Sequence, residues 1–264
     1  MTDQTDAALV ETHLNDGVLH LKLQGGTPHA LSRDMVRALD LAFIHAEQSA
    51  DVRVVVIEGP GHMFCAGHDL KEVMQHRLDE DDGEAFVTEL FDACSAMMAR
   101  LALLPKPTVA MVDGIAAAAG LQLVASCDMA FATPRASFCL PGVKNGGFCS
   151  TPAVAVSQTI GRKALMELLL TGEPKDADWA LQVGLINRIC EPETLAADTF
   201  AFAASVADKN PGPISAGISA LNAHADLPVE DAYAIATPVM VRNFMDPGRR
   251  AREISSKFAP ATKP

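Results

Sequence analysis

The chain has 264 residues, of which 49% are apolar and 20% are charged. These proportions are ordinary for a folded globular protein and exclude a collagen, a coiled coil or a disordered chain. Acidic residues outnumber basic residues 33 to 21, which gives a formal net charge of −12. Because so acidic a protein repels polyanions, we expect no nucleic-acid partner and no membrane partner.

The six cysteines form no C-x-x-C pair, so the sequence predicts no metal site. Residues 1–11 contain acidic side chains but no lysine or arginine, unlike a secretory or mitochondrial targeting segment. The most apolar stretch, Gly114–Cys127, is shorter than the roughly 20 residues that a membrane-spanning helix needs. We therefore expect reduced thiols and a cytoplasmic location.

The N-terminal part of the chain predicts alternating strands and helices. After a loose tail of ten residues, the segment 17–23 alternates leucines with polar residues, which indicates a strand with one buried face. Ser32 is a favourable N-cap for the helix that follows. In chain order, the sequence then predicts a helix over 33–49, a strand over 52–57, a helix from about 70, a helix over 84–103, a strand over 108–112, a helix that ends at 126, and strands over 128–132 and 137–140. This order indicates the α/β class.

The C-terminal part of the chain is predicted to be mostly helical. The sequence predicts helices over 157–170, 176–182, 195–208, 214–224 and about 230–251, with one short strand over 185–189. Because strands stop near residue 190, we expect a core domain over 1–190 and a helical oligomerisation region over 191–264. The late helices carry enough apolar residues, among them Phe202, Met240 and Phe244, to pack against another subunit.

Two segments rich in small residues stand at predicted helix starts. In the first, Ala66 and Gly67 precede His68, and in the second, four alanines lead into Gly120. Small residues let a ligand approach the backbone, and the N–H groups at a helix start favour negative charge. Two such N–H groups converging on one oxygen would form an oxyanion hole. A tight turn and close helix packing are the alternative interpretations of these two segments.

With these motifs in place, the sequence resembles the crotonase, or enoyl-CoA hydratase/isomerase, superfamily. The resemblance covers about 15–260, and its segments are His29-Ala-Leu-Ser32, Asp51–Ile57, Phe64–Lys71, Pro107–Gly114, Ala118–Gly120, Ser126–Asp128 and Gly184–Asn187. It looks most similar to the subgroup called enoyl-CoA hydratase domain-containing protein 3, through Gly67–Glu72, Ala116–Asp128 and Phe148–Pro152. The resemblance implies an α/β, crotonase-like ββα spiral with a C-terminal helical region, assembled as a homotrimer or hexamer.

The resemblance also implies a pocket for an acyl-CoA thioester, with coenzyme A as part of the substrate and no other cofactor. By position, the thioester oxygen would meet the backbone N–H groups of His68 and Ala119. The residues that the resemblance places near the coenzyme A moiety are Ala66, His68, Asp69, Leu70, Lys71 and Lys257.

The sequence departs from the family at the two catalytic glutamates, which correspond to Gln122 and Gly142. An amide is no base near neutral pH, and glycine has no side chain. Because general acid–base groups contribute about 10²–10⁴-fold each, we expect weak classical hydration. Other functional groups expected near the pocket belong to His68, Asp69, Cys139, Asn145, Cys149 and Ser150. The imidazole of His68 has a suitable intrinsic pKa, although a ring that points away while only its N–H acts is the alternative.

These observations predict an enzyme of the enoyl-CoA hydratase/isomerase type that stabilises a thioester enolate. Two other functions remain open. The chain could be a non-catalytic acyl-CoA-binding protein, because both carboxylates are missing. It could also be a CoA-thioester hydrolase or decarboxylase, because an oxyanion hole suits any enolate-like or tetrahedral oxyanion.

Overall fold

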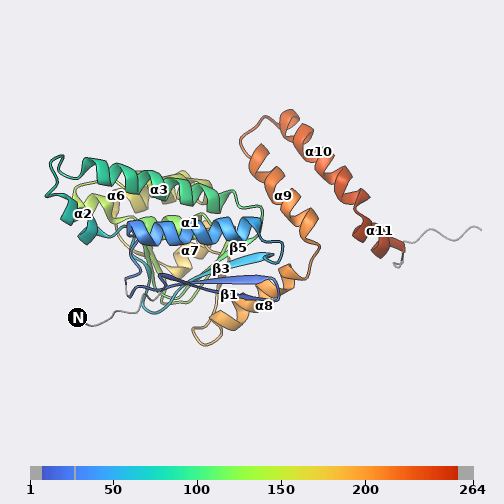
Figure 1. Cartoon of the computed structure of the whole chain (residues 1–264), viewed down its shortest axis with the longest axis horizontal. Coiled ribbons are helices and arrows are strands. Elements are labelled where there is room, and N and C mark those ends of the chain that lie inside the picture. Colours follow the sequence, from blue (N-terminus) through green and yellow to red (C-terminus); the bar gives the residue numbers. More distant parts are fainter. Residues whose placement is uncertain (1–7, 27, 255–264) are drawn as a thin grey trace, which may run out of the picture. The chain divides into compact units, whose positions relative to one another are not determined.

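The computed structural model describes residues 8–26 and 28–254. The chain divides into two compact units, Met1–Ala207 and Asp208–Pro264, and each is considered by itself (Figure 1). The strands of the first unit are β1 (Val10–Asn15), β2 (Val18–Leu23), β3 (Val54–Gly59), β4 (Met63–Cys65), β5 (Thr108–Val112), β6 (Ile115–Ala117), β7 (Met129–Ala132), β8 (Ser137–Cys139), β9 (Lys175–Asp176) and β10 (Arg188–Ile189). Its helices are α1 (Arg33–Gln48), α2 (Leu70–His76), α3 (Glu84–Ala102), α4 (Ala119–Ala125), the 3₁₀ helix η1 (Pro141–Asn145), α5 (Ser150–Thr159), α6 (Arg162–Thr171), α7 (Ala177–Val183) and α8 (Leu195–Ala207).

From β3 to β8, consecutive strands of the first unit alternate between two sheets. The larger sheet has the order β1-β2-β3-β5-β7-β10, and the smaller sheet has the order β4-β6-β8-β9. The pairs β3–β4, β5–β6 and β7–β8 therefore each place one strand in each sheet before the chain continues into helix. The chain thus advances by one ββα turn at a time, and the predicted α/β spiral is confirmed.

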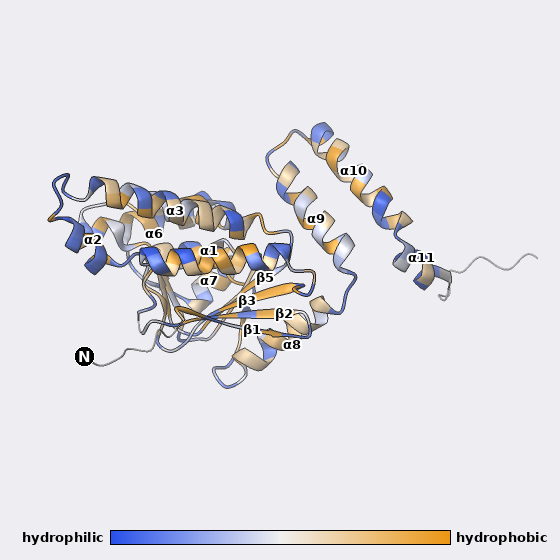
Figure 2. Ribbon diagram, in the orientation of Figure 1, coloured by the Kyte–Doolittle hydropathy of each residue, from blue (hydrophilic) through white to orange (hydrophobic). Residues whose placement is uncertain are grey.

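Strand β3 of the larger sheet is buried on both faces, which explains its continuous apolar run. Val55 and Ile57 pack in the main core with α1 and α3, whereas Val54 and Val56 pack on the opposite face against α8 (Figure 1). All four side chains are fully buried. A parallel strand covered on both sides loses the polar alternation of a one-sided strand. Accordingly, β3 is mostly hydrophobic in Figure 2.

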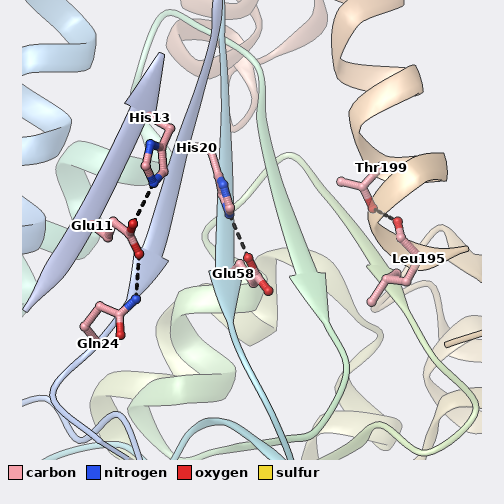
Figure 3. Close-up of polar contacts among 7 residues, drawn as sticks. All are labelled: Glu11, His13, His20, Gln24, Glu58, Leu195 and Thr199. Atoms are coloured by element: carbon pink, nitrogen blue, oxygen red, sulfur yellow. Dashed lines mark hydrogen bonds and ion pairs between the residues drawn. The ribbon is translucent and has the colours of Figure 1, made fainter. Parts of the chain in front are cut away.

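The face of the sheet under α8 also carries a few polar contacts (Figure 3). The imidazole of His20 lies 2.8 Å from the carboxylate of Glu58 on the neighbouring strand, and its ring packs edge-on against Phe200 of α8 at 5.0 Å. Within α8, the hydroxyl of Thr199 donates to the carbonyl of Leu195 at 2.7 Å. These polar groups therefore have partners beside an apolar core, which limits the cost of burying them.

Helix α1 begins and ends close to where the sequence predicted. The side chain of Ser32 accepts a hydrogen bond from the N–H of Met35 at 3.1 Å, so Ser32 caps the helix as expected. Helix α1 ends at Gln48, close to its predicted end. Leu39 and Phe43 lie on its buried face.

Several elements differ from the prediction; among them, strands β4 and β6 lie in segments for which the sequence predicted no strand. Strand β1 was not predicted, because Val10 was assigned to the tail and residues 11–15 are polar apart from Leu14; the strand forms by pairing with β2. The predicted helix 157–170 is two helices, α5 and α6, separated at Gly161, whose ψ of 147° is extended. The predicted helix 230–251 is likewise broken, at Asp246, whose carboxylate accepts from the N–H of Arg249 at 2.9 Å.

The second unit consists of α9 (Pro211–His224), α10 (Val229–Met245) and α11 (Pro247–Ile254). Asn210 caps α9 and also donates to the carboxylate of Asp246 at 2.8 Å. Among the described residues of this unit, only Ala220 is buried. Leu221, Met240 and Phe244 line an apolar groove between α9 and α10. No helix within residues 8–26 and 28–254 is long and apolar enough to cross a membrane.

Candidate active site

The first small-residue segment forms the loop between β4 and α2. Asp69 is the N-cap of α2, and its carboxylate accepts from the N–H groups of Lys71 and Glu72 at 2.8 and 3.3 Å. Leu70 is 63% exposed, and Lys71 is exposed as well. The Asp69 carboxylate therefore has a capping role, whereas the side chains of Leu70 and Lys71 are available to a ligand. Lys257 lies outside the described residues.

The second small-residue segment is the start of α4. Ala118 precedes the helix with a φ of 50°, a value that few non-glycine residues adopt, and its N–H donates to the carbonyl of Cys139 at 3.0 Å. Gly120 lies against β4 so closely that a Cβ there would be 2.0 Å from the carbonyl oxygen of Cys65. Only glycine fits this contact, so the small residues at this helix start serve close packing.

The two segments meet at Gly67, which has a φ of +89°. A Cβ on Gly67 would lie 3.0 Å from the Cβ of Ala118 and 3.1 Å from the nitrogen of Ala119. Within the described residues, the N–H groups of His68 and Ala119 donate to no acceptor in the chain. Two unengaged donors on adjoining segments are the kind of group that can receive a developing oxyanion.

Gln122 stands one turn into α4, three residues after Ala119, so the two side chains lie on the same side of the helix. Its side chain is buried, with 4% exposure, and its Oε1 atom has no hydrogen-bond partner in the described chain. A buried amide oxygen without a partner is uncommon and costs free energy. A substrate group or water that donates a hydrogen bond would satisfy it.

Gly142 lies in η1, where its N–H donates to the thiol sulfur of Cys149 at 3.2 Å. A Cβ on Gly142 would lie 2.8 Å from the nitrogen of Cys149 and 3.0 Å from its sulfur. The position that the family resemblance assigns to the second glutamate is therefore closed to a side chain as the loop stands.

The cysteines near the site are thiols and poor nucleophiles. Burial raises the pKa of Cys139 and of Cys149, and it raises the pKa of Cys65 to about 12. Nucleophilic reactivity requires the thiolate, which these values disfavour. Asn145 and Ser150, the other two candidates, are exposed.

The side chain of His68 packs against α3. Its ring centroid lies 4.4 Å from that of Phe91, and its Nε2 atom is buried without a partner among the described residues. Burial lowers the pKa of His68, so the ring is neutral at pH 7. The imidazole is therefore a free base at neutral pH, in contrast to the thiols.

One residue of the site region was not singled out by sequence reasoning. His29 is 4% exposed, and its Nδ1 atom lies 2.8 Å from the carbonyl oxygen of Met63 in β4. Its sequence signal was weak, since it stood only as the first residue of the His29–Ser32 motif. Within the part of the chain that the structure describes, no three His, Cys, Asp or Glu side chains are grouped as a metal site.

Comparison with known proteins defines the class to which this fold and site belong. The sequence profile of the family described as Enoyl-CoA hydratase/isomerase matches residues 13–253. The chain therefore belongs to the enoyl-CoA hydratase/isomerase family.

Individual proteins within this family are similar to the chain over most of its length. The chain is 37% identical over 242 residues to the mouse protein named "Enoyl-CoA hydratase domain-containing protein 3, mitochondrial", covering 91% of this chain and 79% of that protein. The human structure of enoyl Coenzyme A hydratase domain-containing protein 3 has a TM-score of 0.88 at 33% identity, covering 96% of this chain and 99% of that one. A structure titled an enoyl-CoA hydrotase/isomerase family protein from Silicibacter pomeroyi has a TM-score of 0.86 at 55% identity, covering 91% and 100%. The predicted likeness to the domain-containing protein 3 subgroup is thus confirmed.

Proposed function

We propose that this chain binds an acyl-CoA thioester and stabilises the enolate of that thioester. The observation that carries the proposal is the meeting of two chain segments at Gly67, beside the N–H groups of His68 and Ala119. Donors fixed in advance by the backbone need no reorganisation when charge develops on the thioester oxygen. The side chain of Ala119 does not matter for this role, because the N–H belongs to the backbone.

Turnover also requires a proton acceptor, and the two usual positions do not supply one. Gln122 is an amide and Gly142 is closed by Cys149. Burial lowers the pKa of His68, which keeps its imidazole neutral at pH 7 but makes it a weak proton acceptor. We therefore propose slow hydratase/isomerase-type chemistry and expect the classical two-carboxylate reaction to be weak.

Non-catalytic binding of acyl-CoA is the second candidate, and the closure of Gly142 favours it. Thioester hydrolysis or decarboxylation is a third. Incubation of the chain with a panel of enoyl-, hydroxyacyl- and malonyl-type CoA esters, with identification of the products, distinguishes these functions. Binding without any product supports the second candidate, and the chemical nature of a product separates the other two.

The binding proposal is tested by isothermal calorimetry with butyryl-CoA and with free coenzyme A, using a matched pair of glycine variants. Gly67→Ala adds a methyl 3.1 Å from the nitrogen of Ala119, whereas Gly61→Ala adds the same methyl at a similar φ of +88° with nothing within 4 Å. Both variants therefore carry backbone strain, but only Gly67→Ala disturbs the contact between the Gly67 loop and the start of α4. We expect the Gly67→Ala variant alone to lose affinity for butyryl-CoA. No binding of butyryl-CoA by the native chain at about 1 mM, where binding free energy is only about 4 kcal/mol, would refute the proposal.

We also propose that the chain assembles as a homotrimer or hexamer through the second unit. Among the residues of the second unit that the structure describes, only Ala220 is buried, whereas Leu221, Met240 and Phe244 are exposed, and apolar patches of this kind are typical of interfaces. A cytoplasmic location is proposed from the six free cysteines, which suit a reducing compartment. The mouse relative is named mitochondrial, so cell fractionation is the test.

A further inference from the structure

The strand that leads into the His68 loop contains an irregularity. In the pairing of β4 with β6, Met63 is opposite Ile115 and Cys65 is opposite Ala116. Met63 and Cys65 are two positions apart on β4 but face adjacent residues on β6, so Phe64 is the extra residue of a β-bulge. A bulge bends its strand and disrupts the local ladder, and bulges often redirect the chain beside functional sites.

The imidazole of His29 compensates for this bulge. Its Nδ1 atom lies 2.8 Å from the carbonyl oxygen of Met63 and 3.2 Å from that of Phe64. Because both partners are acceptors, Nδ1 carries the proton and donates to them. His29 is 4% exposed, so loss of this donor would remove a buried hydrogen bond from the bulge.

The segment that carries His29 also holds the His68 loop on both sides. The N–H of Ala66 donates to the carbonyl of Pro28 at 3.1 Å, before His68. The N–H of Leu31 donates to the carbonyl of Gly67 at 2.8 Å, and the carbonyl of Leu31 accepts from the N–H of Asp69 at 3.3 Å. These bonds engage the residues before and after His68 and leave the His68 N–H without an acceptor in the described chain.

We propose that His29 is a positioning residue for the thioester-binding N–H of His68, acting through the bulge in β4. Its imidazole fixes the carbonyls of Met63 and Phe64, and the segment 28–31 then fixes the loop that follows them. The inference rests on the proposed function, because it assigns a purpose to an N–H that is expected to bind the thioester oxygen. A positioning error of about 1 Å at such a group can cost about 10²-fold in rate, so a residue that sets the loop would be under functional constraint.

The test compares two substitutions of His29. In His29→Asn, the amide nitrogen takes the same covalent position as Nδ1, and asparagine tolerates the φ of 49° found here. His29→Ala removes the donor, and Ala118 at a φ of 50° shows that this chain accommodates alanine in such a conformation. His45→Asn, in an exposed histidine of α1, is the control for loss of an imidazole.

The readout is the infrared stretching frequency of the thioester carbonyl in butyryl-CoA labelled with carbon-13 at that carbon, measured with each whole protein. Hydrogen bonds to the oxygen lower this frequency, and a role confined to stability would not change it in a folded variant. We expect the native chain, His45→Asn and His29→Asn to lower the frequency alike. We expect His29→Ala to lose most of the shift while its Kd for butyryl-CoA rises only about fivefold, the equivalent of one hydrogen bond.

The outcomes separate this inference from the proposed function. Absence of binding by the native chain overturns the proposed function and this inference with it. Binding with the full frequency shift in folded His29→Ala overturns the inference alone. If His29→Ala does not unfold cooperatively, His29→Gln decides, because its donor is displaced by one methylene: a reduced shift supports the role of His29, and an unchanged shift refutes it.

Discussion

The substitution Gln122→Glu places a carboxylate at the position that the family resemblance assigns to the first catalytic glutamate, where a side chain fits. The glutamine side chain already fits within α4, and glutamate has nearly the same shape. A general acid–base group contributes about 10²–10⁴-fold, and 10²-fold corresponds to about 2.7 kcal/mol of barrier lowering. We expect the lower end of this range, because the second carboxylate is still absent and the supporting side chains are those of a glutamine site.

The companion substitution Gly142→Glu is expected to fail for a steric reason. Its Cβ would lie 2.8 Å from the backbone nitrogen of Cys149, which cannot rotate away as a flexible side chain could. Overpacking of this kind costs about 1–3 kcal/mol. The double variant should therefore be less stable than Gln122→Glu and gain no further activity.

The assay is hydration of crotonyl-CoA, followed by the loss of enoyl thioester absorbance, with thermal unfolding of each variant in parallel. A glutamate at position 122 would be 4% exposed if it takes the place of the glutamine, and burial raises the pKa of a carboxyl group. Since the carboxylate is the basic form, the gain should increase as pH rises through that elevated pKa. Fast hydration by the native chain would refute this reasoning, as would an unchanged rate in a Gln122→Glu variant that still binds crotonyl-CoA.

Three further outcomes are expected. His68→Ala should keep its affinity for butyryl-CoA in calorimetry, because the backbone N–H is retained, and a large loss of affinity would assign the binding to the ring instead. Because burial lowers the pKa of His68, protonation of its ring disfavours the folded state, and the fold loses stability as pH falls below the ordinary histidine pKa of about 6.5. The variant His68→Gln, which has no ring to protonate, should therefore lose less stability on acidification in urea titrations. Met240→Glu should shift light scattering toward the monomer if the apolar groove of the second unit is an interface, whereas a native chain that is already monomeric would contradict the proposed assembly.

Some helices and strands could be predicted from local sequence, and others could not. Ser32 caps α1, and the apolar run that forms β3 was identified because side-chain polarity and propensity act over a few residues. Strand β1 was missed for the same reason, since its residues acquire strand structure only by pairing with β2. The break at Gly161 was also missed, because apolar spacing continues through it.

The sequence by itself determined the α/β class and the two small-residue segments, and its resemblance to the family predicted that Gln122 and Gly142 replace two catalytic glutamates. Only the tertiary structure decided that Gly67 brings these segments together and that Cys149 closes the position of Gly142. It also decided that His29 supports a strand 34 residues away. The physical reason is that spacing along the chain encodes local conformation, whereas close contacts between distant residues depend on how the sheets and helices pack.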